Sequence, residues 1–132
     1  MFLLAILLSA ASCFALGALW YSPVLFGKLW QSEEGLSDEQ IKQTMEKHGA
    51  KPFIFSFVYA VLAAVGFYVF IRHSTSLGHN LAVGIIVGIL LVATSFGVNY
   101  QFANRGNKLF LIDTGYHVVQ FILYAIVFWY LK

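Results

Sequence analysis

Charged residues are scarce in this chain. Only 11% of its 132 residues are Asp, Glu, Lys or Arg, whereas 60% are hydrophobic. A soluble domain of this size needs more polar surface than this composition supplies. The net charge of +2 is also too small and too dispersed for a nucleic-acid-binding face, which requires clustered basic residues. We therefore expect a protein whose main partner is the lipid bilayer and which binds no nucleic acid.

Cysteine is almost absent, and basic residues are missing from the N-terminal segment. The single cysteine, Cys13, excludes an intrachain disulfide and has no CxxC companion that would bind a metal. No Lys or Arg precedes Lys28, so the segment lacks the cationic start of a secretory signal. A lipoprotein-like cleavage at Cys13 is the alternative, but the residues before it match that pattern poorly. We expect the first apolar stretch to be retained as a membrane span.

Four apolar stretches occupy most of the chain. A membrane-spanning helix needs ~20 mostly apolar residues, and each stretch is about that long. They cover residues 2–21, 53–71, 81–98 and 109–131, approximately. The expected fold class is all-α: one domain, residues 1–132, that forms an integral membrane bundle of four transmembrane helices with one short amphipathic loop helix.

The first helix is expected to end near Trp20 and Tyr21. Pro23 disfavours the helical conformation of the residue before it, so the helix should stop there. Trp and Tyr side chains are also typical of the headgroup level of a membrane. Residues 24–30 are apolar but too short to span, and we expect them to lie in the interface.

Residues 31–51 form the only strongly polar segment of the chain. Ser37 and Gln40 have the spacing of a capping box, in which the two side chains satisfy each other's backbone N–H groups. Gly49 is typical of the position that follows a helix. The segment therefore predicts a helix from about Asp38 to His48.

Basic residues are unevenly distributed over the loops. The first and third loops carry six of the eight Lys and Arg residues, namely Lys28, Lys42, Lys47, Lys51, Arg105 and Lys108. Loops rich in Lys and Arg remain on the cytoplasmic side of a membrane. We therefore expect loops one and three to be cytoplasmic and both termini to lie outside.

Polar side chains recur on one face of the fourth stretch. Asp113, His117, Gln120 and Tyr124 follow one another at steps of four, three and four residues, which places them on one side of a helix. Ionisable residues inside a membrane mark a function or a buried partner. A carboxylate and an imidazole one turn apart can handle a proton or a cation. Asn99, near the end of the third stretch, could face Asp113.

This polar stripe also has structural explanations. Asp113 lies near the end of its span, where it could anchor the helix by pairing with Lys108, Arg105, Lys28 or Lys51. Polar side chains also join membrane helices by hydrogen bonds. No activated-serine motif, paired carboxylates, HExxH motif or phosphate-binding glycine loop is present, so we expect no catalytic residues, cofactor or metal site.

Three hypotheses about function remain open. The first is a homo-oligomeric transporter or channel for protons, cations or a small solute. The second is a non-catalytic scaffold or partner-binding subunit that uses loop one as its contact surface. The third is a membrane enzyme that acts on a lipid or a small electrophile.

Small residues recur at four-residue spacing in two of the spans. Gly84 and Gly88 form a GxxxG motif, Gly97 lies four residues after an alanine, and Gly17 lies four after the cysteine. Such spacing lets helix backbones approach closely. These faces could meet within one chain or between chains. Because four short helices enclose little interior, we expect a homo-oligomer.

Two separated motifs connect the chain to a known family. They are WYSPVLFGKLW at residues 20–30 and NRGNKLFLIDTGY at residues 104–116. Together they resemble a family of small four-helix bacterial membrane proteins known only as a domain of unknown function, over nearly the whole chain. The resemblance implies a bacterial inner-membrane protein and supplies no activity. The motif positions it marks are Trp20, Tyr21, Pro23, Phe26, Gly27, Lys28, Trp30, Asp113 and Gly115.

The predicted topology can be tested with single cysteines in a variant that lacks Cys13. We expect a membrane-impermeant thiol reagent on intact cells to label a cysteine at Ser76, on the outer side, and to spare one at Ser32. Mass spectrometry of the purified protein would measure the labelling. Reaction at Ser32 with none at Ser76 would reverse the assignment.

Overall fold

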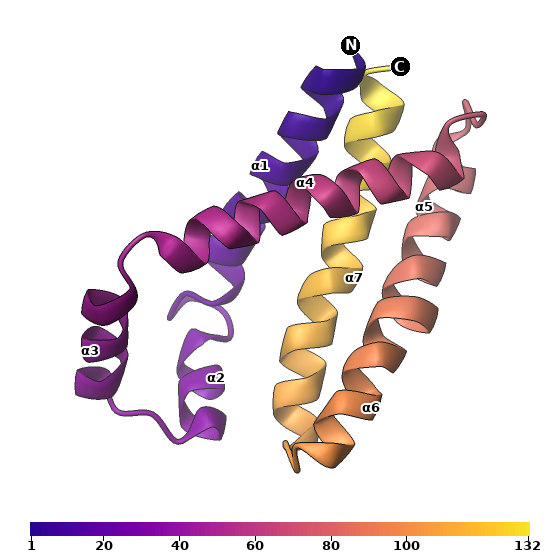
Figure 1. Ribbon diagram of the computed structural model, residues 1–132. Coiled ribbons are helices and arrows are strands. Elements are labelled where there is room, and N and C mark those ends of the chain that lie inside the picture. Colours follow the sequence, from indigo (N-terminus) through magenta and orange to yellow (C-terminus); the bar gives the residue numbers. More distant parts are fainter.

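The computed structural model describes residues 1–132 and is entirely α-helical (Figure 1). It contains six helices, if three consecutive segments of the third span are counted as one. The elements are α1 (Phe2–Trp20), α2 (Gly27–Glu34), α3 (Asp38–His48), α4 (Lys51–Ile71), α5 (Leu77–Ile86), the π-helical segment η1 (Val87–Ala93), α6 (Thr94–Phe102) and α7 (Asn107–Tyr130). Segments α5, η1 and α6 form one continuous helix.

Four of these helices are long and apolar enough to cross a membrane. They are α1, α4, the continuous helix over Leu77–Phe102, and α7. Each begins and ends within four residues of the bounds expected from the sequence. The prediction of an all-α protein with four membrane-spanning helices is confirmed, and the chain is a multi-pass membrane protein.

The short helix α3 forms where the capping signals predicted it. The Ser37 hydroxyl accepts the Gln40 backbone N–H at 3.2 Å, and the Gln40 side-chain oxygen accepts the Ser37 N–H at 2.8 Å. Gly49 ends the helix with a φ of +54°, in the left-handed region that favours glycine. Within α3 only Ile41 is even partly buried. Local signals therefore determine this helix, with little help from packing.

The buried core lies in the half of the bundle nearest the two chain termini. Figure 1 shows both termini at one end, with α4 crossing in front of α1 and α7 and running at its N-terminal end toward α3. Most core residues come from α1, from α4 from Ala60 onward and from the second half of α7, and η1 adds Val87. They include Ala5, Ile6, Ala10, Ala60, Ala64, Phe67, Phe121, Tyr124, Ala125 and Phe128. The opposite half of the bundle is therefore less completely filled.

Close packing of the third span on α7 depends on two glycines. A Cβ atom at Gly84 would lie 2.8 Å from the Phe121 carbonyl oxygen, and one at Gly88 would lie 2.8 Å from Val118 Cα. Real Cβ atoms do not approach backbone this closely. The predicted GxxxG face thus packs against α7 of the same chain, as small-residue motifs do between membrane helices.

The other two glycines of the small-residue motifs make looser contacts. A Cβ at Gly17 would lie 3.5 Å from the Tyr116 hydroxyl, and one at Gly97 would lie 3.6 Å from the Phe110 ring. These are ordinary van der Waals distances. Both positions also face residues of α7. Helix α7 is therefore the helix on which both the first and the third spans pack.

The π-helical segment η1 changes which residues of α6 face α7. The eleven residues from Gly88 to Asn99 make about three turns of an α-helix, which would place Asn99 on the Gly88 face. A π-helix bonds residue i to i+5 and so uses more residues per turn. As a result Tyr100 faces the bundle and is only 6% exposed, whereas Asn99 is exposed.

The substitution Gly88→Leu tests this packing. We expect it to lower the free energy of unfolding by about 1–3 kcal/mol or more, because the new side chain must displace the α7 backbone at Val118. Thermal unfolding in mild detergent, followed by circular dichroism, measures the effect. Gly66→Leu is the matched control, since a Cβ there meets nothing within 4 Å. Equal melting temperatures for the two variants would contradict the packing described here.

Candidate functional site

The end of α1 docks on α7 through Trp20, its last residue. Its indole Nε1–H donates to the Ile112 carbonyl oxygen at 2.9 Å. The indole ring lies so near Gly115 that a Cβ there would be 3.1 Å from it. The turn after α1 requires Gly27, where a Cβ would collide with the Tyr21 carbonyl oxygen. These contacts place the Tyr21 side chain over α7.

Two tyrosine hydroxyls hold the carboxylate of Asp113. Tyr21 donates to Oδ1 at 2.7 Å, and Tyr100 donates to Oδ2. Burial, and then the hydrogen bond to Asp113, raise the pKa of the Tyr21 hydroxyl above its usual value, so this group remains a donor. Hydrogen bonds from neutral donors stabilise the negative charge without cancelling it.

The basic residues of the neighbouring loop are paired with other acids. Arg105 forms an ion pair with Glu34, and Lys108 lies 3.7 Å from Glu33. These pairs connect α2 to the turn between α6 and α7 and to the first turn of α7. No Lys or Arg lies within ion-pair distance of Asp113, so none of the cationic partners considered from the sequence forms an ion pair with it.

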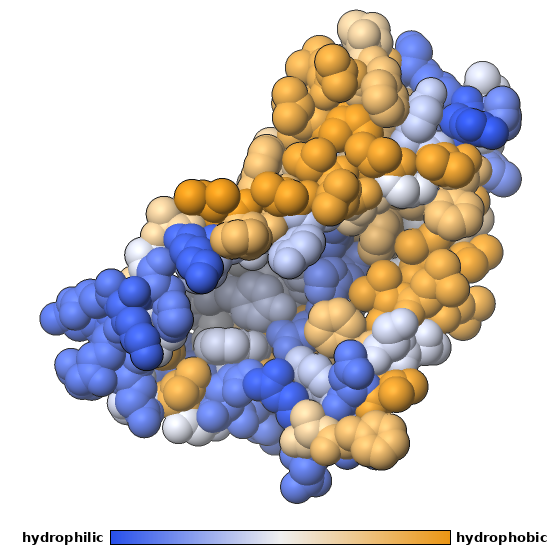
Figure 2. Space-filling view, viewed as in Figure 1, coloured by the Kyte–Doolittle hydropathy of each residue, from blue (hydrophilic) through white to orange (hydrophobic).

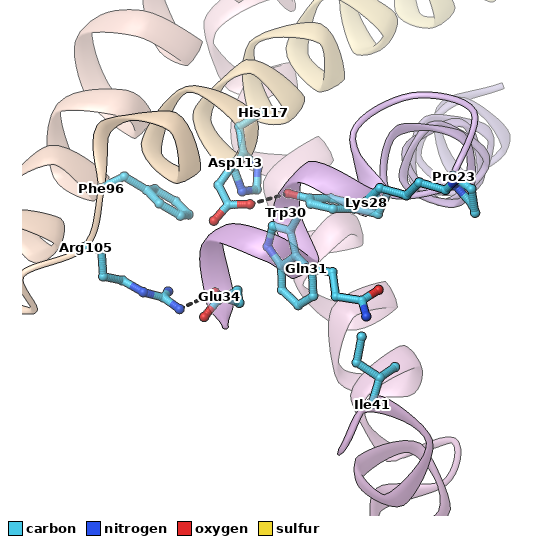
Figure 3. A pocket seen from close by; sticks show the side chains of 12 residues that line it. Pro23, Lys28, Trp30, Gln31, Glu34, Ile41, Phe96, Arg105, Asp113 and His117 are labelled. Carbon is cyan, nitrogen blue, oxygen red and sulfur yellow. Dashed lines mark hydrogen bonds and ion pairs between the residues drawn. The ribbon is translucent and has the colours of Figure 1, made fainter. Parts of the chain in front are cut away.

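A cavity of about 620 Å³ lies beside Asp113, where the bundle is less filled. We call it the loop-side cavity, because loops one and three surround it. Figure 2 shows the hollow beneath α4, and Figure 3 shows the side chains that line it. Asp113 and His117 face it together with the aromatic rings of Tyr21, Trp30 and Phe96. The cavity thus combines one unpaired carboxylate with an aromatic wall.

A chain of hydrogen bonds continues from His117 into the core. Tyr124 donates to the Ala60 carbonyl oxygen at 2.9 Å, and this oxygen can only accept. The Tyr124 oxygen therefore accepts the side-chain N–H of Gln120, also at 2.9 Å. Gln120 then presents its oxygen to His117 Nδ1 at 2.7 Å, so Nδ1 carries the proton. When the ring is neutral, Nε2 is an acceptor, and no protein group donates to it.

His117 also borders a second, smaller pocket of about 380 Å³. Cys13, Tyr59 and Gln120 contribute to its wall together with Tyr116, whose hydroxyl lies 2.7 Å from the Cys13 sulfur. The imidazole therefore lines both the loop-side cavity and this second pocket.

The family of the chain follows from a match over almost its whole length. Residues 4–129 match the family described as "Protein of unknown function (DUF1761)". The chain belongs to the DUF1761 family. No curated protein and no solved structure matches it. This membership confirms the resemblance to a family of unknown function. Because no activity is described for the family, the site itself has to indicate the function of this DUF1761 chain.

The structure separates the residues of the predicted polar stripe. Asp113 and His117 line one cavity but form no hydrogen bond with each other, while Gln120 and Tyr124 continue inward from the histidine. Asn99 is exposed, and its side chain forms no hydrogen bond.

Neither the position of Tyr100 beside Asp113 nor the contact between Tyr21 and Asp113 was predicted from the sequence. The available signal was the pair of motifs, because segments that mark one family often meet in space. Here the 20–30 motif of this DUF1761 protein packs directly on the 104–116 motif.

Tyr21→Phe removes one donor from the Asp113 carboxylate. We expect the free energy of unfolding to fall by about 1–2 kcal/mol, because the carboxylate loses a charge-assisted hydrogen bond. The same change in an Asp113→Asn background should cost less, and chemical denaturation in detergent would measure this double-mutant cycle. Tyr130→Phe, at a 78% exposed position, is the control. Strictly additive effects of the two changes at the site would show that the pair is uncoupled.

Proposed function

We propose that this DUF1761 protein is a small transport protein of the bacterial inner membrane that conducts protons or a monovalent cation. Asp113 is the only acidic residue in the four spans. It carries no ion pair and borders a cavity that opens at the loop face. The unpaired carboxylate of Asp113 beside an open cavity is the observation that supports the proposal most strongly. A charge inside a membrane is costly, and where one occurs it usually belongs to an ion or proton pathway.

The depth of the polar groups supports a route rather than a surface site. At 1.5 Å per residue, Asp113 lies about 9 Å and His117 about 15 Å from the start of α7. The free Nε2 of His117 can take a proton that arrives through the loop-side cavity. The hydrogen bonds through Gln120 and Tyr124 continue the polar line toward the packed core. The closed core then forms the barrier that a transport cycle has to open.

The orientation proposed for this protein places the cavity mouth on the cytoplasmic side. Loops one and three surround the mouth and carry six of the eight basic residues, which supports this placement. The homo-oligomer stays part of the proposal, although Gly84 and Gly88 no longer argue for it because they pack within the chain. The exposed apolar face of α4 is the surface available for contact between copies.

Flux measurements on proteoliposomes test the transport proposal. With a pH-sensitive dye to report protons and a potential-sensitive dye to report other cations, we expect protein-dependent flux in sodium, potassium or choline buffers. Asp113→Asn should reduce the flux to that of protein-free vesicles while the protein still assembles. Glu46→Gln, the same change of charge on the exposed helix α3, should leave it unchanged. Absence of protein-dependent flux in every buffer would contradict the proposal.

A scaffold role is the second candidate, and the exposure of α3 favours it. Nearly every residue of this helix faces solvent, so the helix is free to meet another protein. In that case Asp113→Asn would either leave the function of the protein intact or prevent folding, and the vesicles would show no flux. The two functions therefore give opposite results in the same assay.

A further inference from the structure

We propose that the loop-side cavity binds a small organic ammonium cation, with its charge at Asp113 and its alkyl groups against the rings of Trp30, Tyr21 and Phe96. The inference rests on the proposed function for its site and adds the chemical class of the ligand. Three properties of the cavity support it: its charge, its walls and its size.

The charge at the cavity floor is negative and accessible. A carboxylate offers about four acceptor positions, and each oxygen of Asp113 uses one of them for a tyrosine. Arg105, which also borders the cavity, is held by Glu34. Figure 3 shows the Lys28 side chain running toward Pro23 and away from Asp113. No cation of the protein therefore occupies the place beside the carboxylate.

The walls of the cavity suit a cation that is partly apolar. The rings of Tyr21 and Trp30 meet edge to face, with centroids 6.1 Å apart. Figure 3 shows Phe96 and Trp30 next to Asp113. Aromatic faces attract cations through their quadrupole, and they do so best for alkylated ammonium groups, which lose little hydration on binding. A strongly hydrated inorganic ion gains much less from such walls.

The size of the cavity and the small number of possible metal ligands in it also favour an organic cation. A volume of about 620 Å³ lies within the usual range of small-molecule sites, ~300–1,000 Å³. Nowhere in the chain do three or more His, Cys, Asp or Glu side chains gather as a metal site requires. Calcium takes six to eight oxygen ligands, whereas this cavity offers one unpaired carboxylate. The site therefore matches one diffuse positive charge.

Equilibrium dialysis of radiolabelled choline against the purified protein in mild detergent tests the inference. We expect saturable binding that tetramethylammonium displaces. The neutral isostere 3,3-dimethylbutan-1-ol should not displace it, nor should Na⁺ or Mg²⁺ at the same concentration and constant ionic strength. Absence of saturable choline binding, or equal displacement by the neutral alcohol or by Na⁺, would overturn the proposal. This arm uses only the wild-type protein, so it does not depend on the folding of a variant.

Two substitutions locate the ligand. Asp113→Asn should weaken choline binding about tenfold or more, and Trp30→Leu should weaken it severalfold. Glu46→Gln and Trp129→Leu, the matched changes away from the cavity, should leave the affinity unchanged. Unchanged affinity in both site variants would place the ligand elsewhere and refute the assignment. Choline binding without flux in vesicles would uphold this site and reject transport, whereas proton flux without choline binding would do the reverse.

Discussion

The hydrogen bond from the Trp20 indole to the Ile112 carbonyl oxygen is the contact on which the candidate site depends. It fixes the turn after α1 against the side of α7, and it thereby brings Tyr21 to Asp113. Helix α2 follows this turn, and its C-terminal residues Glu33 and Glu34 reach Lys108 and Arg105 at the connection between α6 and α7. Without this contact the cavity would lose one wall and the carboxylate one of its two donors. The site is therefore a product of docking and not of any single helix.

The two halves of the bundle differ in how well side chains fill them. Near the termini, alanines of α1 and α4 allow close approach, and aromatic residues of α4 and α7 fill the remaining space. Toward loops one and three, the first half of α4 turns its large apolar residues outward, and Phe53, Ile54 and Phe55 are all exposed. Side chains that face lipid cannot fill the interior. The hollow beside Asp113 follows from the direction of α4 as much as from the residues that line it.

Local and compositional signals predicted the fold well, because they depend on residues close in sequence. The spans follow from length and apolarity, and α3 follows from its capping box. The spacing of Asp113 and His117 along one helix likewise placed both at one cavity. The partners of Asp113 were beyond such reasoning. Tyr21 is separated from it by 92 residues, and Tyr100 reaches it only because η1 departs from the α-helical period that the sequence analysis assumed.

The hollow half of the bundle also determines how the protein experiences a membrane voltage. Water in the loop-side cavity would carry the potential of the solution, so little of the voltage would then fall between the loop face and His117. The drop is concentrated over the packed half, which covers about 20 Å along α7 from His117 to Tyr130. Moving one elementary charge through the full potential changes its energy by about 2.3 kcal/mol per 100 mV. Nearly all of that work would be done on a charge in a short segment of the bundle, where the electric field is correspondingly steep.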